Sequence, residues 1–156
     1  MAQVRVETED RLQAQVRLAQ EDRYRFSVAM DHPAWRLTVD EAPPLGTGAG
    51  PNPARPVATA VGHCLASSLQ HCLERARVEG ARLAVTVDVD IRRNARGRWR
   101  IGRILAGLDI SGVSPAQRAA VERCRHLFEE FCIVTASVRQ GIPVDVAVRV
   151  DGVEMA

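Results

Sequence analysis

The spacing of apolar residues along this chain switches between two periods, and this constrains the fold more than any other feature. A period of two is typical of β-strands, and a period of three to four is typical of one face of an α-helix. The period of two covers residues 1–40, 82–111 and 143–150, and the helical period covers 56–78 and 114–132. The order strands, helix, hairpin, helix, strand predicts an α+β fold with antiparallel strands and two long helices. At 156 residues we expect one domain with a sizeable core.

Local signals mark where these elements begin and end. Residues 41–55 are rich in Gly and Pro and predict a loop, either ordered or a plain linker. Pro56 suits the first turn of a helix, where its missing N–H costs nothing. Ser114, Pro115 and Gln117 form a helix-capping pattern before the second helix. Residues 10–20 fit a strand or a helical turn, and both remain open.

Charge and composition exclude several classes of function. The chain has 21 basic and 19 acidic side chains, so no excess of charge predicts binding to nucleic acid or to a membrane surface. All the basic residues are arginine, which excludes Schiff-base chemistry on lysine. The chain has no apolar run near the roughly 20 residues of a membrane span, and its start has no apolar signal-peptide core. Four cysteines without a secretion signal predict reduced thiols and a cytoplasmic location.

Cys64 and Cys132 are the candidate catalytic residues. Cys64 lies among small residues on the first predicted helix, and Cys132 closes the second. A thiolate can attack a peroxide oxygen, become a sulfenic acid and condense with a second thiol to form a disulfide. The same spacing also fits two inert thiols packed in a core. Because burial raises the pKa of a thiol, a reactive Cys64 requires a nearby cation, which we expect from an arginine of the strand region or of a partner subunit.

The remaining cysteines and two histidines have simpler interpretations. Cys72 and Cys124 lie on apolar helix faces and are expected to pack in the core. A zinc site of four cysteines is the alternative, but the usual CxxC spacing is absent, so no metal is predicted. His63 and His71 each precede a cysteine and are expected to be partly exposed. A contact across a dimer remains open for these histidines.

The chain resembles the osmotically inducible protein C and organic hydroperoxide resistance family (OsmC/Ohr) from about Val39 to Val150. The resemblance rests on the loop Asp40-Glu-Ala-Pro-Pro-Leu-Gly, on Gly50-Pro-Asn-Pro before the Cys64 helix, on Cys132-Ile-Val-Thr-Ala-Ser-Val, and on Gly141-Ile-Pro-Val-Asp-Val-Ala-Val. It implies an intertwined homodimer with the two long helices at its centre and the active site at the subunit interface. It also implies reduction of organic hydroperoxides without a cofactor and recycling by a dithiol such as dihydrolipoamide. In this family Cys64 matches the peroxidatic cysteine and Cys132 the resolving cysteine.

The chain departs from the family pattern at two positions. The family helix opens with Asn-Pro-Glu, and the Glu positions an arginine over the thiolate, whereas this chain has Ala54 in place of the Glu. The resolving cysteine is usually followed by Pro and here by Ile133. Asp40 or Glu41 could compensate for the missing acid. The candidates for the family's arginine are Arg23, Arg25 and Arg36.

The first hypothesis for function is therefore a thiol peroxidase that takes part in the oxidative stress response. The alternative is a non-catalytic protein of the same fold that binds a small ligand or senses redox state, and Ala54 supports it. Neither hypothesis involves nucleic acid, a membrane or a cofactor.

Overall fold

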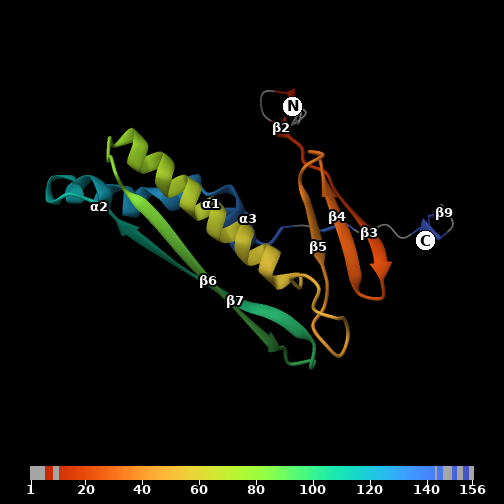
Figure 1. Ribbon diagram of the computed structural model, residues 1–156. Coiled ribbons are helices and arrows are strands. Elements are labelled where there is room, and N and C mark those ends of the chain that lie inside the picture. The colour runs from red at the N-terminus through yellow and green to blue at the C-terminus, as the bar shows by residue number, and fades with distance from the viewer. Residues whose placement is uncertain (1–5, 9–10, 143, 146–148, 151–152, 155–156) are drawn as a thin grey trace. The chain divides into compact units, whose positions relative to one another are not determined.

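The computed structural model divides the chain into two compact units. One consists of Met1–Thr59 and Asp88–Leu105, and the other of Ala60–Val87 and Ala106–Ala156 (Figure 1). The structure describes residues 6–8, 11–142, 144–145, 149–150 and 153–154. The prediction of a single domain stays a prediction, and each unit is described below by itself.

The first unit contains the expected strands of the N-terminal region. Strand β3 (Val16–Asp22), β4 (Arg25–Met30) and β5 (Arg36–Val39) form an antiparallel sheet in the order β3-β4-β5. Val28 of the central strand lies opposite Leu18 and Leu37 and is 6% exposed. The alternative of a helical turn is therefore wrong for the described part of residues 10–20. Two shorter strands, β1 (Val6–Thr8) and β2 (Arg11–Leu12), pair with each other.

The loop after β5 is ordered by one carboxylate. Asp40 is 3% exposed. It accepts hydrogen bonds from the backbone N–H groups of Glu41 at 2.8 Å, Thr47 at 2.9 Å and Ala49 at 3.1 Å, and from the Thr47 hydroxyl at 2.7 Å. Gly46 passes so close to Asp40 that a Cβ atom would overlap with the carboxylate. This part of the predicted loop is thus a folded turn rather than a linker.

Asp40 makes the stability of this loop depend on pH. The Thr47 hydroxyl is the main cause that lowers the pKa of Asp40 from 3.8 to about 2, and burial opposes it. A lowered pKa in the folded state contributes stability that is complete above the unfolded value and is lost as pH falls from about 4 to about 2. We expect Asp40→Asn to lower the free energy of unfolding at pH 7. We also expect the free energy of unfolding of this variant to decrease less than that of the unmodified protein between about pH 4 and about pH 2. Urea unfolding at pH 7, 4 and 2 measures this, with the exposed Asp22→Asn as the control. An unchanged pH dependence in Asp40→Asn would contradict it.

The first long helix and the hairpin form as expected. Helix α1 (Ala54–Arg75) has Pro56 in its first turn. Strands β6 (Arg82–Arg93) and β7 (Trp99–Ser111) pair in a two-stranded sheet. Within the second unit, a Cβ atom on the buried Gly62 of α1 would lie 2.8 Å from the Val87 side chain. A residue without a side chain therefore lets α1 approach β6 closely.

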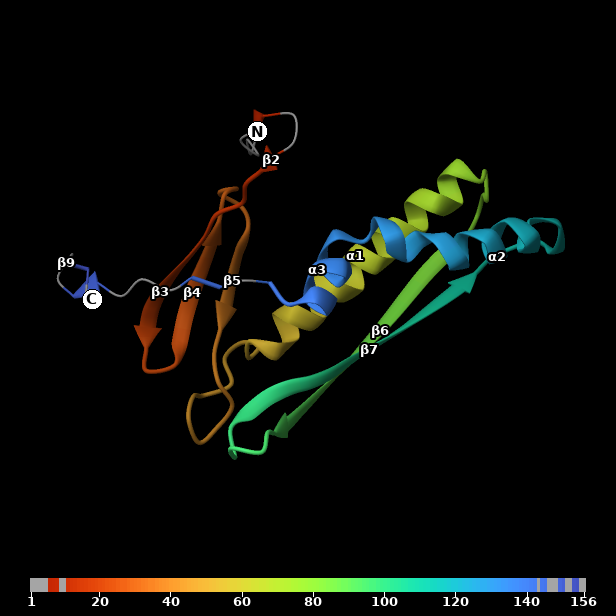
Figure 2. The same cartoon turned by 180° about the vertical axis from the view of Figure 1, so that it is seen from behind.

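The predicted helix over residues 114–132 is interrupted, and a further helix follows it. Its capping pattern opens a 3₁₀ turn at Pro115–Gln117, where the Gln117 side chain accepts hydrogen bonds from the N–H and hydroxyl of Ser114. Helix α2 (Arg118–Leu127) follows, and a second 3₁₀ turn covers Phe128–Phe131. Helix α3 (Ile133–Gln140) was not predicted. Both views show α2 and α3 alongside the part of α1 that belongs to the same unit (Figures 1 and 2).

The core of the second unit lies between α1 and the segment from α2 to Cys132. Its residues share an exposure below 9% and comprise Val61, Leu65, Leu69, Leu73, Val78, Cys124, Phe128 and Cys132. Two apolar residues of the predicted helix are exposed, Leu127 at 48% and Phe131 at 64%. Because the 3₁₀ turn at Phe128–Phe131 changes the rotation per residue from that of an α-helix, Phe131 does not continue the buried face of α2.

The end of the chain only partly tests the predicted last strand. Of residues 143–150, positions 143 and 146–148 lie outside the described residues. The described part has β8 (Arg149–Val150) paired with β9 (Val153–Glu154). None of the helices in the described residues is long and apolar enough to cross a membrane.

Candidate active site

The structure brings Cys64 and Cys132 together. Cys64 lies on α1, and Cys132 lies at the cap position that precedes α3. Both are free thiols, and their side chains form a hydrogen bond with each other. Cys64 is half-buried, whereas Cys132 is 0% exposed. Of the two residues, Cys64 is therefore the more accessible to a molecule in solution.

Cys132 is surrounded by groups that favour its thiolate. Its Sγ lies 2.9 Å from Oγ1 of Thr135, a residue that is itself 7% exposed. Burial opposes ionisation, but hydrogen bonds from Cys64 and from the hydroxyl and backbone N–H of Thr135, with the positive charge of Arg139, lower the pKa of Cys132.

Cys64 has the opposite tendency. Burial is the main cause that raises its pKa, and the hydrogen bond with Cys132 raises it further. Hydrogen bonds from the backbone N–H groups of Val134 and Ile133 act in the other direction without reversing the shift. These N–H groups belong to the first turn of α3, where they have no partner within the helix. Of the two thiols, Cys132 is therefore the one whose pKa is lowered and Cys64 the one whose pKa is raised.

Thr135 and Arg139 are site residues that the sequence interpretation missed. Both follow Cys132 at helical spacing, at three and seven residues, but residues 133–140 were not predicted to be helical. Arg139 is also ion-paired with Glu129. An arginine near the thiols was expected from the strand region or a partner subunit, and Arg139 of α3 supplies a positive charge that acts on Cys132.

Replacing Thr135 by valine tests this environment. We expect the pKa of Cys132 to rise, because the variant keeps the shape of the side chain and loses the hydroxyl that pairs with Sγ and would donate to the thiolate once it forms. Absorbance of the thiolate at 240 nm during a pH titration measures the change, and Thr135→Ser, which keeps the hydroxyl, is the control. A titration of Thr135→Val identical to that of the unmodified protein would contradict the assignment.

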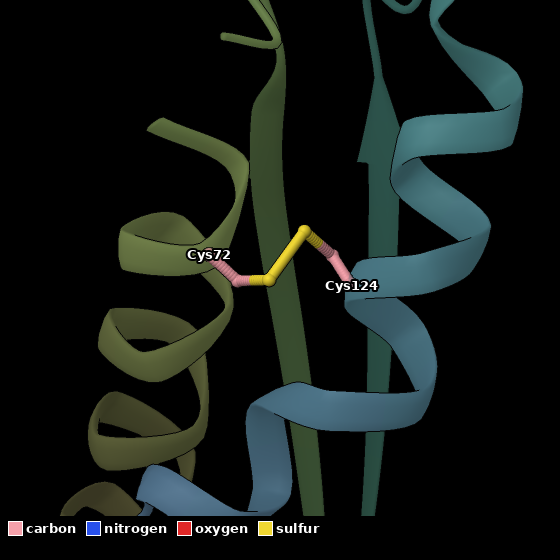
Figure 3. The surroundings of a disulfide bond; sticks show 2 residues. All are labelled: Cys72 and Cys124. Atoms are coloured by element: carbon pink, nitrogen blue, oxygen red, sulfur yellow. A yellow bond between two sulfur atoms is a disulfide. The ribbon is translucent and has the colours of Figure 1, made fainter. Parts of the chain in front are cut away.

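The other two cysteines form a disulfide, which corrects the prediction of four reduced thiols. Cys72 of α1 and Cys124 of α2 are bonded to each other, with Cα atoms 5.6 Å apart (Figure 3). Their position on apolar helix faces is as expected, since Cys124 is 1% exposed. Each of the two residues was treated as a packing thiol because their proximity depends on how α2 docks on α1. The inference of a cytoplasmic location from reduced thiols loses this support.

The structure offers no metal site in its described residues. No group of three or more His, Cys, Asp or Glu side chains lies close enough there to hold a metal ion. His63 and His71 are exposed. His63 lies 3.5 Å from the Ser67 hydroxyl on the same helix.

The candidate arginines of the strand region each have local contacts. Arg25 forms an ion pair with Glu21 at 3.5 Å. The Arg23 guanidinium lies 5.7 Å from the centre of the Tyr24 ring. Arg36 lies opposite Ala29 in the sheet. These contacts do not select one of the three arginines, so their role toward Cys64 stays a prediction.

The position of the missing family acid is also clear. Ala54 is the first residue of α1, and the Arg55 side chain next to it donates a hydrogen bond to Asn52 at 2.9 Å. Both carboxylate oxygens of Asp40 already accept hydrogen bonds from the loop. Asp40 lines a depression of about 380 Å³ with Arg55, and no cysteine lines it. The role of Asp40 as a substitute for the missing acid stays a prediction.

Comparison with known proteins gives one family. The sequence model of the family described as OsmC-like protein matches residues 46–147. No curated protein matches the chain.

Solved structures of similar fold come from several bacteria. An OsmC-like protein from Mycoplasma pneumoniae has a TM-score of 0.68 at 13% identity and covers 83% of this chain and 89% of its own. An OsmC-like protein of unknown function from Vibrio cholerae has a TM-score of 0.65 at 15% identity, covering 80% and 92%. An organic hydroperoxide resistance protein from Elizabethkingia anophelis has a TM-score of 0.60 at 17% identity, covering 83% and 91%. At these identities the likeness establishes the fold.

Proposed function

Because this chain belongs to the OsmC-like protein family, we propose that it is a thiol-dependent peroxidase that reduces organic hydroperoxides through Cys64 and Cys132. The observation that supports the proposal is the hydrogen bond between two free thiols, one half-buried and one buried. Two sulfur atoms in hydrogen-bond contact need little movement to form a disulfide.

In the proposed first step, Cys64 attacks the peroxide. Cys132, once ionised, accepts the proton of the Cys64 thiol, and the Cys64 sulfur attacks the terminal oxygen of the hydroperoxide. The O–O bond breaks, and the alkoxide takes up a proton and leaves as an alcohol. Cys64 is then a sulfenic acid, oxidised by two electrons. The hydrogen bonds from Ile133 and Val134 favour the thiolate of Cys64 while it forms.

In the second step, Cys132 resolves the sulfenic acid. Its sulfur attacks the Cys64 sulfur, the S–O bond breaks, and water leaves after protonation. A dithiol such as dihydrolipoamide then reduces the Cys64–Cys132 disulfide by two exchange reactions and becomes a disulfide itself. The apolar residues around the pair, which include Leu65 and Phe128, favour alkyl or fatty-acid hydroperoxides over hydrogen peroxide.

We also propose that the protein acts as an intertwined homodimer, as the family resemblance implies. A partner chain would cover exposed apolar side chains of the hairpin, such as Trp99 at 58% and Leu105 at 46%. Sedimentation equilibrium measures the mass, and a monomer at micromolar concentration would contradict the dimer. The cytoplasmic location stays a prediction.

A thiol count and peptide mass map with and without cumene hydroperoxide test the proposed activity. We expect two free thiols per chain before treatment and none afterwards, with a new peptide that links Cys64 to Cys132. A parallel reaction with hydrogen peroxide is expected to be slower. Two unreacted thiols after excess cumene hydroperoxide would overturn the proposal.

The second candidate function is a non-catalytic redox-sensing or ligand-binding protein. The raised pKa of Cys64 favours it, because burial is the main cause of that shift. Ala54 favours it as well, since it cannot hold an arginine as the family's acid does. An unreactive Cys64 together with an apolar ligand retained during purification would support this second function.

A further inference from the structure

We propose that the Cys72–Cys124 disulfide is a positioning cross-link that holds α1 and α2 in the register that brings Cys64 and Cys132 together. The role of the cross-link in turnover rests on the proposed function, whereas the positioning itself does not. The disulfide would then govern how fast Cys132 resolves the oxidised Cys64.

The two cysteine pairs both join α1 to the segment that runs from α2 to Cys132, and we call the boundary between these two segments the seam. Cys72 lies eight residues after Cys64 on α1, and Cys124 lies eight residues before Cys132 on the facing segment. The two segments therefore run antiparallel (Figure 1), and one register satisfies both contacts, of which Figure 3 shows the disulfide. The core residues Leu65, Leu69 and Leu73 of α1 lie along the same seam.

The disulfide is too far from the thiols to exchange with them. Eight residues of α-helix span about 12 Å along the axis. Thiol–disulfide exchange requires direct contact between sulfur atoms. The Cys72–Cys124 bond therefore acts on the thiol pair through the helices and not as an intermediate in the reaction.

The segment that carries Cys132 benefits from such an anchor. A continuous α-helix would fix Cys132 relative to Cys124, but the helix ends at Leu127 and a 3₁₀ turn follows. Hydrogen bonds of a 3₁₀ turn have poorer geometry than those of an α-helix. Only Cys124, Phe128 and Cys132 of residues 118–132 are buried. The disulfide thus fixes the last helical turn before the break.

The register matters because a disulfide tolerates little displacement. Its two Cα atoms are usually about 4.4 to 6.8 Å apart. A slip of one helical turn moves a residue by about 5.4 Å. Without the cross-link, arrangements in which Cys132 misses Cys64 become populated, and the effective concentration of one thiol at the other falls.

The effective concentration of the thiol pair can be measured without any peroxidase activity. The protein is equilibrated with glutathione and glutathione disulfide, which oxidises Cys64 and Cys132 and is reduced to two glutathione thiols. The Cys64–Cys132 disulfide is quantified by peptide mass mapping, which also checks that Cys72–Cys124 stays intact. We expect Cys72→Ala/Cys124→Ala to lower the effective concentration by about tenfold or more. Removing both cysteines avoids a free thiol that could pair with Cys132.

Two further variants separate positioning from general loosening. Leu73→Ala leaves a cavity beside Cys72 with the disulfide in place, and we expect its effective concentration to stay within about twofold of the unmodified protein. Cys72→Val/Cys124→Ala restores apolar volume without the bond, and it serves if the double alanine variant does not fold. An effective concentration unchanged in the folded double variant, or lowered equally in Leu73→Ala, overturns the proposal.

A single turnover with cumene hydroperoxide then tests the step affected. Trapping with dimedone reports the Cys64 sulfenic acid. We expect the conversion of this sulfenic acid to the disulfide to slow about tenfold in the double variant. A conversion as fast as in the unmodified protein would overturn the role of the cross-link in turnover. If the unmodified protein forms no sulfenic acid, the proposed function fails, and the glutathione measurement still decides the positioning.

Discussion

Replacing Cys64 by serine is expected to lower the rate of cumene hydroperoxide consumption by about a thousandfold or more. A serine hydroxyl is a far weaker nucleophile than a thiol, and removal of a nucleophile usually costs rates of this order or greater. The change keeps the size of the side chain and leaves Leu65 and the rest of the seam in place. Loss of peroxide in the presence of dihydrolipoamide measures the rate.

Cys132→Ser is the matched comparison, because it removes the other thiol of the pair. We expect this variant to reduce one equivalent of peroxide, to accumulate a Cys64 sulfenic acid and then to stop. If instead Cys64→Ser retains the first turnover and Cys132→Ser loses it, the roles of the two thiols are reversed. The lowered pKa of Cys132 makes that comparison essential, since the buried sulfur is the one that ionises more readily.

Removal of the Cys72–Cys124 disulfide is expected to lower the free energy of unfolding by about 2 to 4 kcal/mol. The bond joins residues 52 positions apart and so restricts a large part of the unfolded chain. Urea unfolding of Cys72→Ala/Cys124→Ala against the unmodified protein measures the difference. Cys64→Ser/Cys132→Ser is the control, because it changes the same number of cysteines without opening a bond in the resting protein. Equal stability of all three proteins would contradict the expected effect.

The parts of the fold that could be predicted are those in which the apolar period matches the local structure. The helix that begins near Pro56 falls in this class because it has one buried face. Strand β6 does so as well, because exposed and partly buried residues alternate over its first nine positions. The interruption of the helix at Phe128–Phe131 could not be predicted, because the helical spacing of apolar residues continues through it. Its position follows from packing against α1, which a local pattern does not contain.

The candidate site was predictable in part for the same reason. Cys64 and Cys132 were chosen from their flanking residues and from the family resemblance, and the structure places them in contact. The bond between Cys72 and Cys124 was missed because four cysteines allow three pairings and sequence alone does not choose among them. Thr135 was missed because its role depends on a helix that begins at Ile133.

Because the two cysteine pairs are separate, the number of disulfides in this protein does not tell which pair is oxidised. Oxidation of either cysteine pair to a disulfide removes two electrons. The distance between the pairs prevents direct thiol–disulfide exchange from one to the other. A chain with one disulfide and two thiols can therefore exist in two forms of identical mass that differ in which pair is oxidised. The form with the Cys72–Cys124 disulfide has two free thiols at the candidate active site and a cross-link between α1 and α2. The form with the Cys64–Cys132 disulfide has neither. Peptide mapping therefore distinguishes a protein that can react with peroxide from one that is already oxidised at the active site.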